Sequence, residues 1–379
     1  MEFGMPDEIV ALRKQMRELI AAHVTPSELE KAHETGTNIC LPLYRAMGEA
    51  GLIRRAVPGV GKGDPLELFT ITNELEKAAA PFDAISMVIQ LSAVISRVGS
   101  QELQDEVLPR LMTGESLVCF GMTEPDAGSD LAAVQTRAER DGEDWVINGS
   151  KVWTTMAHVS DWAFMFTRSG ERGDGRAGYT TFFIPMDTPG IRIEPIWTMS
   201  TERSNTTFFD DVRVPARYVL GEVDQGWKTL SVMLSFERGM GNTAGGIPLL
   251  RRFADWAKES GAIDDPLVRD EMARVAIDNE VSRLLTQRTV WRAAQGELAG
   301  VEGSIAKVFA TEAYQRAART FQAAAGPAGT LGFGEADAAA GGWIDHDARH
   351  SIPQTFQGGT SEINRNNIAE RHLGLPRTR

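Results

Sequence analysis

The sequence predicts an α+β protein of three domains, in the order helical, β, helical. Apolar residues recur at the spacing of amphipathic helices through about residue 116. From 117 to 222, short runs rich in β-branched and aromatic residues alternate with turn clusters, which is typical of strands. Helical periodicity then returns and continues almost to the end. We therefore expect domains at 1–116, 117–222 and 223–379, with an antiparallel sheet because no helices separate the strands.

The first domain opens on an amphipathic helix that follows Pro6. Its apolar face consists of Ile9, Leu12, Met16, Leu19 and Ile20. Further helices are expected around 43–48, 66–79, 86–98 and 101–113. The glycines of GVGKGD (59–64) are interpreted as a solvent turn, because no strand precedes them and no Lys-Ser or Lys-Thr follows as in a phosphate loop.

The later domains carry their own local signals. Strands are expected in SLVCFGM, DWVING, DWAFMFTRS, YTTFFIP, GIRIEPIW and TTFFDDVRV. After Gly226 the pattern is helical, with an apolar stripe formed by Ile277, Val281, Leu284 and Leu285. A final helix is predicted over 361–373, stopped by Gly374 and Pro376.

Charge and composition exclude several classes of protein. The chain has 39 Lys and Arg against 52 Asp and Glu, a formal net charge of −13, whereas a nucleic-acid binder needs a basic surface. No apolar run approaches the roughly 20 residues that span a bilayer, so no membrane insertion is expected. Cys40 and Cys119 show no paired spacing and the N-terminus is too acidic for a signal peptide, so we expect a cytoplasmic protein.

No metal site is predicted either. Asp345, His346, Asp347 and His350 have side chains that a metal could use, but no further ligand stands out to complete a zinc site. A Gly-x-Ser-x-Gly elbow is missing from the sequence, so hydrolase chemistry gains no support.

The segment richest in candidate chemistry is CFGMTEPDAGSDL (119–131), followed by GSKVWTT (149–155). The small residues of 126–130 allow a backbone to approach an anion, and the Ser129 hydroxyl can join it. Thr123 and Thr155 place hydroxyls at strand ends, and Trp153 offers an aromatic face to a planar ring. The alternative is an ordinary strand–turn–strand whose polar groups are satisfied internally.

Together with NTTFFDDVRVP (205–215) and GGTSEINRNNIAERHLGLPR (358–377), these segments resemble the acyl-CoA dehydrogenase family, in order from about residue 66 to 377. The resemblance implies a helical N-terminal domain, a β-barrel-like middle domain and a C-terminal four-helix bundle. It also implies FAD between the middle domain and the bundle, and an acyl-CoA thioester on the flavin. Expected cofactor contacts are Met122, Thr123, Ser129, Trp153, Thr155, Thr360 and Glu362.

The resemblance also locates the base that removes the substrate's α-proton. Many members have a Glu immediately before the Gly-Thr of the C-terminal segment, but here that position is Gly358. A minority, including the isovaleryl- and long-chain-specific enzymes, use a helix Glu that corresponds to Glu237. The sequence supports this independently, because Trp227, Leu230 and Leu234 share a helical stripe with Glu237. A structural interior ion pair is the alternative role for that carboxylate.

Further expectations concern the substrate. By resemblance, the Gly358 N–H polarises the thioester carbonyl, and Ser129, Arg203 and Arg238 are candidate substrate contacts. Four glycines follow the base, at 239, 241, 245 and 246. They predict either an acyl pocket enlarged for a branched or cyclic group, or a broken helix with close interhelical packing.

The assembly is left open between two forms. The Arg-x-x-Phe-Gly and Gln-x-x-Gly-Gly-x-Gly segments, which in the family reach a neighbouring subunit's FAD, are absent or degraded in RRFADWAKESGAIDDP and AAAGPAGTLG. A homotetramer and an α2β2 heterotetramer are both expected possibilities, with an electron-transfer flavoprotein as the acceptor implied by the family. Alternatives to the dehydrogenase are a same-fold flavin monooxygenase and a flavin-poor partner subunit.

Overall fold

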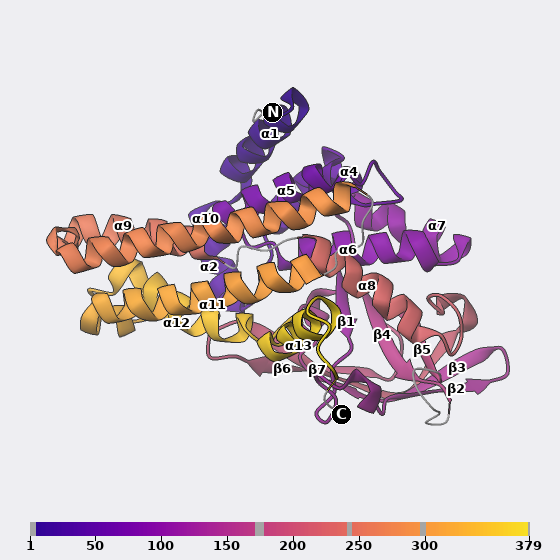
Figure 1. The fold of residues 1–379 in the computed structure, drawn as a ribbon. Coiled ribbons are helices and arrows are strands. Elements are labelled where there is room, and N and C mark those ends of the chain that lie inside the picture. The colour runs from indigo at the N-terminus through magenta and orange to yellow at the C-terminus, as the bar shows by residue number, and fades with distance from the viewer. Residues whose placement is uncertain (1–4, 171–177, 241–244, 296–300, 378–379) are drawn as a thin grey trace. The chain divides into compact units, whose positions relative to one another are not determined.

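A computed structural model describes residues 5–170, 178–240, 245–295 and 301–377; the side chains of 235–240 lie outside this description. The chain divides into two compact units. Unit 1 consists of Met1–Ile71 and Ala80–Phe236, and unit 2 of Thr72–Ala79 and Glu237–Arg379. The predicted order of helical, β and helical segments is confirmed (Figure 1).

The N-terminal helices form where the apolar period predicts them. They are α1 (Asp7–His23), α2 (Pro26–Thr35), α3 (Leu41–Glu49), α4 (Leu52–Ala56), α5 (Pro65–Lys77), α6 (Asp83–Val98) and α7 (Gln101–Met112). α1 buries the stripe of Ile9, Leu12 and Met16. The side-chain oxygens of Thr25 and Ser100 accept backbone N–H groups at the starts of α2 and α7, as N-caps do.

The strands of unit 1 form one mixed sheet within the described residues. They are β1 (Val118–Gly121), β2 (Arg137–Asp141), β3 (Asp144–Lys151), β4 (Trp162–Arg168), β5 (Tyr179–Pro185), β6 (Ile191–Trp197) and β7 (Arg203–Pro215). The order is β1-β4-β2-β3-β7-β6, with β5 also on β4. Most pairs are antiparallel, as expected, but β1 and β2 each pair with β4 in parallel. Parallel pairing needs a long crossover, and the chain between β1 and β4, which includes the β2–β3 hairpin, provides one.

Aromatic rings fill the space around β4 and β5, whose residues are buried except at their last positions. Trp162 stacks on Phe183 with ring centroids 5.5 Å apart, and Phe166 stacks on Tyr179 at 5.2 Å. The next helix, α8 (226–240), starts against this cluster, because the Trp227 ring meets Phe166 edge-on at 5.4 Å. The cluster therefore fixes the first turn of α8 on the sheet.

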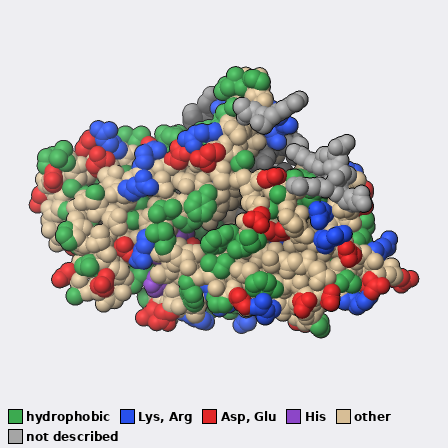
Figure 2. All heavy atoms as spheres, turned by 90° about the horizontal axis from the view of Figure 1, so that it is seen from below, with side chains coloured by type: hydrophobic (Ala, Val, Ile, Leu, Met, Phe, Trp, Pro, Cys, Tyr) green, Lys and Arg blue, Asp and Glu red, His purple; other side chains and the backbone are tan. Residues whose placement is uncertain are grey.

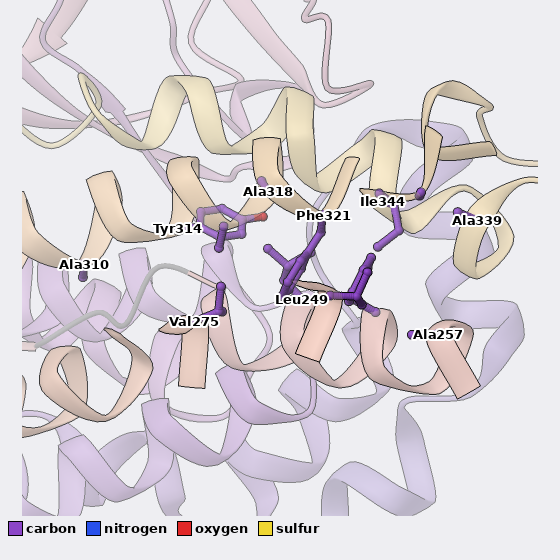
Figure 3. Close-up of a cluster of buried hydrophobic side chains, with 13 residues drawn as sticks. Leu249, Ala257, Val275, Ala310, Tyr314, Ala318, Phe321, Ala339 and Ile344 are labelled. Carbon is purple, nitrogen blue, oxygen red and sulfur yellow. The ribbon is translucent and has the colours of Figure 1, made fainter. Parts of the chain in front are cut away.

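Unit 2 contains the helices of the bundle, which are α9 (Gly246–Ser260), α10 (Pro266–Ala294), α11 (Val301–Ala324), α12 (Trp343–Gln354) and α13 (Ser361–Arg371). α11 contacts all the others. The core in Figure 3 joins Leu249 of α9, Val275 of α10, and Tyr314 and Phe321 of α11. Phe321 stacks on Phe253 with centroids 3.9 Å apart. Alanines on α11 allow this close approach of the neighbouring helices.

The predicted helix of the α10 stripe is present, but two of the four stripe residues face solvent and Val281 and Leu285 are only half-buried. Ile277 is 63% exposed and Leu284 51%. The buried face carries Val275, Ser282 and Thr286 instead. Ser282 donates to a carbonyl one turn back in its own helix at 2.8 Å, so its hydroxyl is buried with a partner.

Packing and backbone conformation explain two of the four glycines that follow Glu237 in the sequence. A Cβ on Gly246 would lie 2.2 Å from the Asn279 side chain of α10, and Gly245 has a φ of +78°. The Asn279 amide also donates to the Gly246 carbonyl at 2.9 Å. At both positions the close-packing interpretation therefore holds, rather than an enlarged pocket. Position 241 and the surroundings of 239 lie outside the description.

Short 3-10 turns connect many of these elements. They are η1 (Leu131–Ala133), η2 (Ala157–Val159), η3 (Ala216–Tyr218), η4 (Ala262–Asp264), η5 (Gly326–Thr330) and η6 (Ala339–Gly342). Figure 2 shows acidic and basic side chains interspersed over the face in view. In the described ranges, no helix combines the length and apolar character needed to cross a membrane.

Candidate functional site

Two segments of unit 1 that the motifs single out lie side by side. Met122 and Thr123 follow the end of β1, and 152–155 follows the end of β3. The backbone N–H of Val152 donates to the carbonyl of Thr123 at 2.9 Å. This bond brings together the four residues that the sequence assigns to one ring-binding surface, Met122, Thr123, Trp153 and Thr155.

Trp153 is held in a strained and exposed conformation. Its φ of +60° lies in the left-handed region, and 56% of its side chain is exposed. A non-glycine residue there costs about 1–3 kcal/mol and persists where its surroundings fix it. Asn205 of β7 provides that support next door. It donates to the Thr154 carbonyl at 3.0 Å, and its own carbonyl accepts the Thr154 N–H at 2.9 Å.

A buried ion pair lies directly behind this surface. Lys151, the last residue of β3, is 0% exposed, and its Nζ donates to Glu124 Oε1 at 2.7 Å. The same ammonium donates to the carbonyls of Phe166 at 2.6 Å and Met122 at 3.2 Å. The Glu124 carboxylate also accepts two backbone N–H groups, from Gln135 at 2.6 Å and from the next residue at 2.9 Å. Both charges are therefore paired and hydrogen-bonded, as buried charges must be.

The pair remains ionised at neutral pH. Burial lowers the pKa of Lys151 to about 8, against the opposing attraction of Glu124. Burial alone would raise the pKa of the Glu124 carboxyl, but the Lys151 charge and the hydrogen bonds hold it below its usual value.

His158 connects the surface to the turn that follows helix α2. Its Nδ1 accepts from the Asn205 amide at 3.2 Å, so its Nε2 carries the proton and donates to Thr37 Oγ1 at 2.8 Å. Burial, followed by the nearby Arg203 charge, lowers the pKa of His158 to about 4. The imidazole is therefore neutral at pH 7.

Arg203 is the first residue of β7 and lies at the turn from β6. Its Nε donates to the side-chain oxygen Oδ1 of Asn205 at 3.1 Å, and its backbone N–H donates to the backbone carbonyl of Gly36 at 2.8 Å. With Lys31 and Trp197 it lines a cavity of about 400 Å³ beside α2. The structure thus gives Arg203 a turn-fixing role, and its predicted substrate contact stays a prediction.

The loop after Glu124 has an open outer face. Backbone hydrogen bonds of 3.1 Å join Glu124 and Ala127 in both directions, which makes a tight turn. Ser129 is exposed. A Cβ on Gly128 would meet no atom within 4 Å, so this side of the loop faces open space.

The remaining predicted residues belong to unit 2. Gly358 has a φ of +62°, which favours glycine. Thr360 N-caps α13, where its Oγ1 accepts the Ile363 N–H at 3.1 Å, and Glu362 is exposed in the first turn. Glu237 and Arg238 continue helix α8, but their side chains lie outside the described residues.

Three family profiles match the chain: acyl-CoA dehydrogenase N-terminal domain at 6–115, middle domain at 119–212 and C-terminal domain at 224–373. Acyl-CoA dehydrogenase IpdE1 of Mycobacterium tuberculosis is 35% identical over 76% of this chain and 74% of its own. The chain belongs to the acyl-CoA dehydrogenase family. It is therefore an oxidoreductase, and its cofactor is FAD, as in the family.

Solved structures of related proteins have the same fold as this chain. The structure titled Tcur3481-Tcur3483 steroid ACAD is 28% identical, with a TM-score of 0.90 over 100% of both chains. A chain of the ChsE4-ChsE5 complex from Mycobacterium tuberculosis is 29% identical, with a TM-score of 0.88 over 100% of both.

The residues of unit 1 fit an FAD molecule. The exposed indole of Trp153, with hydroxyls at Thr123 and Thr155, suits a planar uncharged ring that needs stacking and hydrogen bonds. The open loop at 126–130 suits a diphosphate, because small residues let the backbone approach it. On unit 2, Thr360 and Glu362 stay predicted contacts.

The possible metal ligands of α12 have other partners. Asp347 accepts from Tyr314 at 2.7 Å and pairs with Arg252 at 3.2 Å. His346 and His350 stack on each other with ring centroids 5.5 Å apart. Within the described ranges, no group of three potential metal ligands comes together.

Sequence reasoning missed the residues behind the surface. Glu124 and Lys151 lie inside the motifs MTEP and GSKVWTT, but nothing local indicates that a lysine side chain turns inward. Asn205 begins the motif NTTFFDDVRVP, but nothing local indicated the role of Asn205 or His158, because their partners lie 51 and 121 residues away. Only the pairing of β3 with β7 brings Asn205 to this place.

We predict that His158→Gln reduces the acid sensitivity of the dehydrogenase. The unfolded state binds a proton near pH 6.5, whereas the folded state resists it until about pH 4. The stability of the wild type is therefore complete above pH 6.5 and falls as the pH drops toward 4. The fall in melting temperature between pH 7.5 and 5 should be smaller in the variant. His372→Gln, at an exposed site after α13, serves as the control and should follow the wild type.

Proposed function

We propose that the dehydrogenase forms an α,β double bond in a bulky acyl-CoA thioester, with Glu237 as the base. The observation that carries the proposal is the surface of unit 1, where strained and exposed Trp153 lies beside Thr123 and Thr155. Strain of this kind is retained where a bound group uses it. When bound, FAD supplies the two-electron acceptor for the hydride that leaves the β-carbon.

The position of Glu237 on helix α8 supports its role as the base. Leu230 is fully buried and Trp227 packs on the sheet, so this stripe of the helix turns inward. Position 237 falls on the same stripe, seven residues after Leu230. A carboxylate on an inward stripe is desolvated, which raises its pKa toward the range of a general base. It takes the α-proton, and the electrons of that C–H bond form the double bond as the β-hydride leaves.

The α-proton also needs to be made acidic, and Gly358 is the proposed donor. Its backbone N–H would stabilise negative charge on the thioester oxygen. The positive φ of Gly358 supports this, because a side chain would strain the turn that presents the N–H. Ser129, Arg203 and Arg238 are the proposed contacts of the rest of the substrate, and an electron-transfer flavoprotein is the proposed acceptor.

Glu237→Gln should lower turnover by roughly two to four orders of magnitude, because the amide cannot accept the α-proton. Bound flavin should be unchanged, as seen in the visible spectrum. The matched control is Glu222→Gln, an exposed carboxylate just before α8, which should keep full turnover. Intact activity in Glu237→Gln would show that another group is the base.

A bulky acyl group is supported by the relatives. The Tcur3481-Tcur3483 structure is titled a steroid ACAD, and it covers the whole of this chain. The glycines at 239 and 241 follow the proposed base directly, and they remain candidates for a widened pocket after Gly245 and Gly246 are explained by packing.

We therefore expect faster turnover with a ring-bearing acyl-CoA than with butyryl-CoA, because a pocket widened for a bulky group would leave a short straight chain poorly positioned. Steady-state kcat/KM for both thioesters, measured with the same artificial electron acceptor, gives the comparison. A clear preference for butyryl-CoA would refute the bulky substrate while leaving the base untouched.

An α2β2 assembly is the proposed oligomer. The ChsE4-ChsE5 structure pairs two polypeptides by its title. In this chain, the segments at 251–266 and 323–332 depart from the family patterns that reach a neighbour's FAD. A partner chain that carries those patterns would complete the site.

Expressed alone, the chain should then bind less than one FAD per polypeptide, and co-expression with its partner should restore the full content. Native mass spectrometry with flavin absorbance measures both quantities. A tetramer of four 41.4 kDa chains with one FAD each would contradict the α2β2 proposal.

A further inference from the structure

The buried Lys151 ammonium is surrounded by three acceptors from two separate segments of the chain. Glu124 lies in the turn after β1, Met122 precedes that turn, and Phe166 belongs to β4. A lysine has three N–H donors, so all three are used. These acceptors adjoin the proposed flavin site of unit 1. Thr123 lies between Met122 and Glu124, and Trp153 follows Lys151 by two residues.

We infer that Lys151 is a positioning residue for FAD, which locks the turn at 122–124 against the segment 152–155 so that both present one surface to the flavin ring. The inference rests on the proposed site and deepens it. The chain leaves β3 at Lys151, so the residue that emerges next and donates to Thr123 is Val152. A shift of the ammonium would therefore move both segments relative to each other.

Stabilisation of the fold alone does not account for such a pair. Removing two charges from water costs free energy, and replacing a buried ion pair with apolar groups of similar volume is often neutral or stabilising. Apolar groups, however, cannot hold the polar groups of the backbone in a fixed orientation. The ammonium fixes the carbonyl of Met122 and, through Glu124, the N–H groups of Gln135 and Thr136.

The strained backbone of Trp153 requires neighbouring residues that are held in a fixed orientation. Its positive φ is not favoured by its own side chain, so hydrogen bonds on both sides have to impose it. On one side Lys151 and Val152 are fixed by the pair, and on the other Thr154 is fixed by Asn205. Loss of the first anchor leaves Trp153 free to relax.

Through Phe166, the Lys151 ammonium is also connected to the start of α8 and to the residues after the open loop. The ring of Phe166, whose carbonyl accepts from Lys151, stacks on Tyr179 and meets Trp227 at the start of α8. The Tyr179 hydroxyl donates to the carbonyl of Ala132 at 2.6 Å, just past the open loop. Lys151 thus also supports the elements next to the ring surface.

The test compares Lys151→Met with the loss of a partly buried ion pair elsewhere in unit 1. Arg55→Met breaks the Arg55–Glu67 pair, which joins α4 to α5 at 2.6 Å and whose Glu67 is 1% exposed. Both variants should lose stability in urea. Only Lys151→Met should weaken FAD binding, by about tenfold or more, and shift the flavin midpoint potential, because only it moves the ring surface.

A double variant separates positioning from stability. Glu124→Gln with Lys151→Met removes the unpaired buried charge, so the free energy of unfolding should recover while the FAD dissociation constant stays raised. If FAD affinity returns together with stability, or never changes in Lys151→Met, Lys151 is structural only and the inference is wrong.

Lys151→Arg extends the test to a variant that keeps the charge. Its planar guanidinium keeps the charge but cannot direct three bonds to the same acceptors, so FAD affinity of the folded variant should fall. Full FAD affinity in a folded Lys151→Arg would also contradict the inference. These measurements read FAD affinity and potential, so they stay informative if Glu237 is not the base.

Discussion

Removing a lysine ammonium from water forces the surrounding chain to supply an acceptor for each of its N–H groups. Around Lys151 this requirement is met by a carboxylate and two main-chain carbonyls, and the carboxylate then requires donors of its own from Gln135 and Thr136. These hydrogen bonds hold the ends of β1, β3 and β4 together. The exposed Trp153 and the hydroxyls of Thr123 and Thr155 lie on the outer side of this region.

The sequence predicts those features of the fold that depend on neighbouring residues. Helical spacing locates α1, and the β-branched runs locate the strands, because both periods are local. Pairing between strands is not local. The parallel contact of β1 with β4 arises because a whole hairpin intervenes, and no pattern within either strand indicates it. The buried polar face of α10 has a similar cause, since Ser282 and Thr286 are buried where polarity predicts exposure, and the Ser282 hydroxyl finds its acceptor within its own helix.

Part of the candidate site was equally accessible from the sequence. The motifs named Met122, Thr123, Trp153 and Thr155, and the structure brings their segments together through one backbone bond. The supporting residues were not accessible. Asn205 and His158 bond to residues distant in the sequence, His158 to Thr37 in the turn after α2. The sequence alone does not distinguish a buried lysine from one at the surface. At Gly246 the sequence suggested a feature that the structure does not have. The run of glycines indicated space for a ligand, but Asn279 fills the space beside Gly246.

The segment Thr72–Ala79, which comprises the end of α5 and the two residues after it, belongs to unit 2 although the residues before and after it belong to unit 1. In this segment Glu76 accepts the backbone N–H of Gly245, 169 residues later. On the ribosome, the segment emerges long before its packing partners are synthesised. Contacts of such sequence separation form slowly, and apolar surface that waits for them is prone to aggregation. The packing of Thr72–Ala79 in unit 2 can therefore be completed only after the C-terminal half of the chain has been translated.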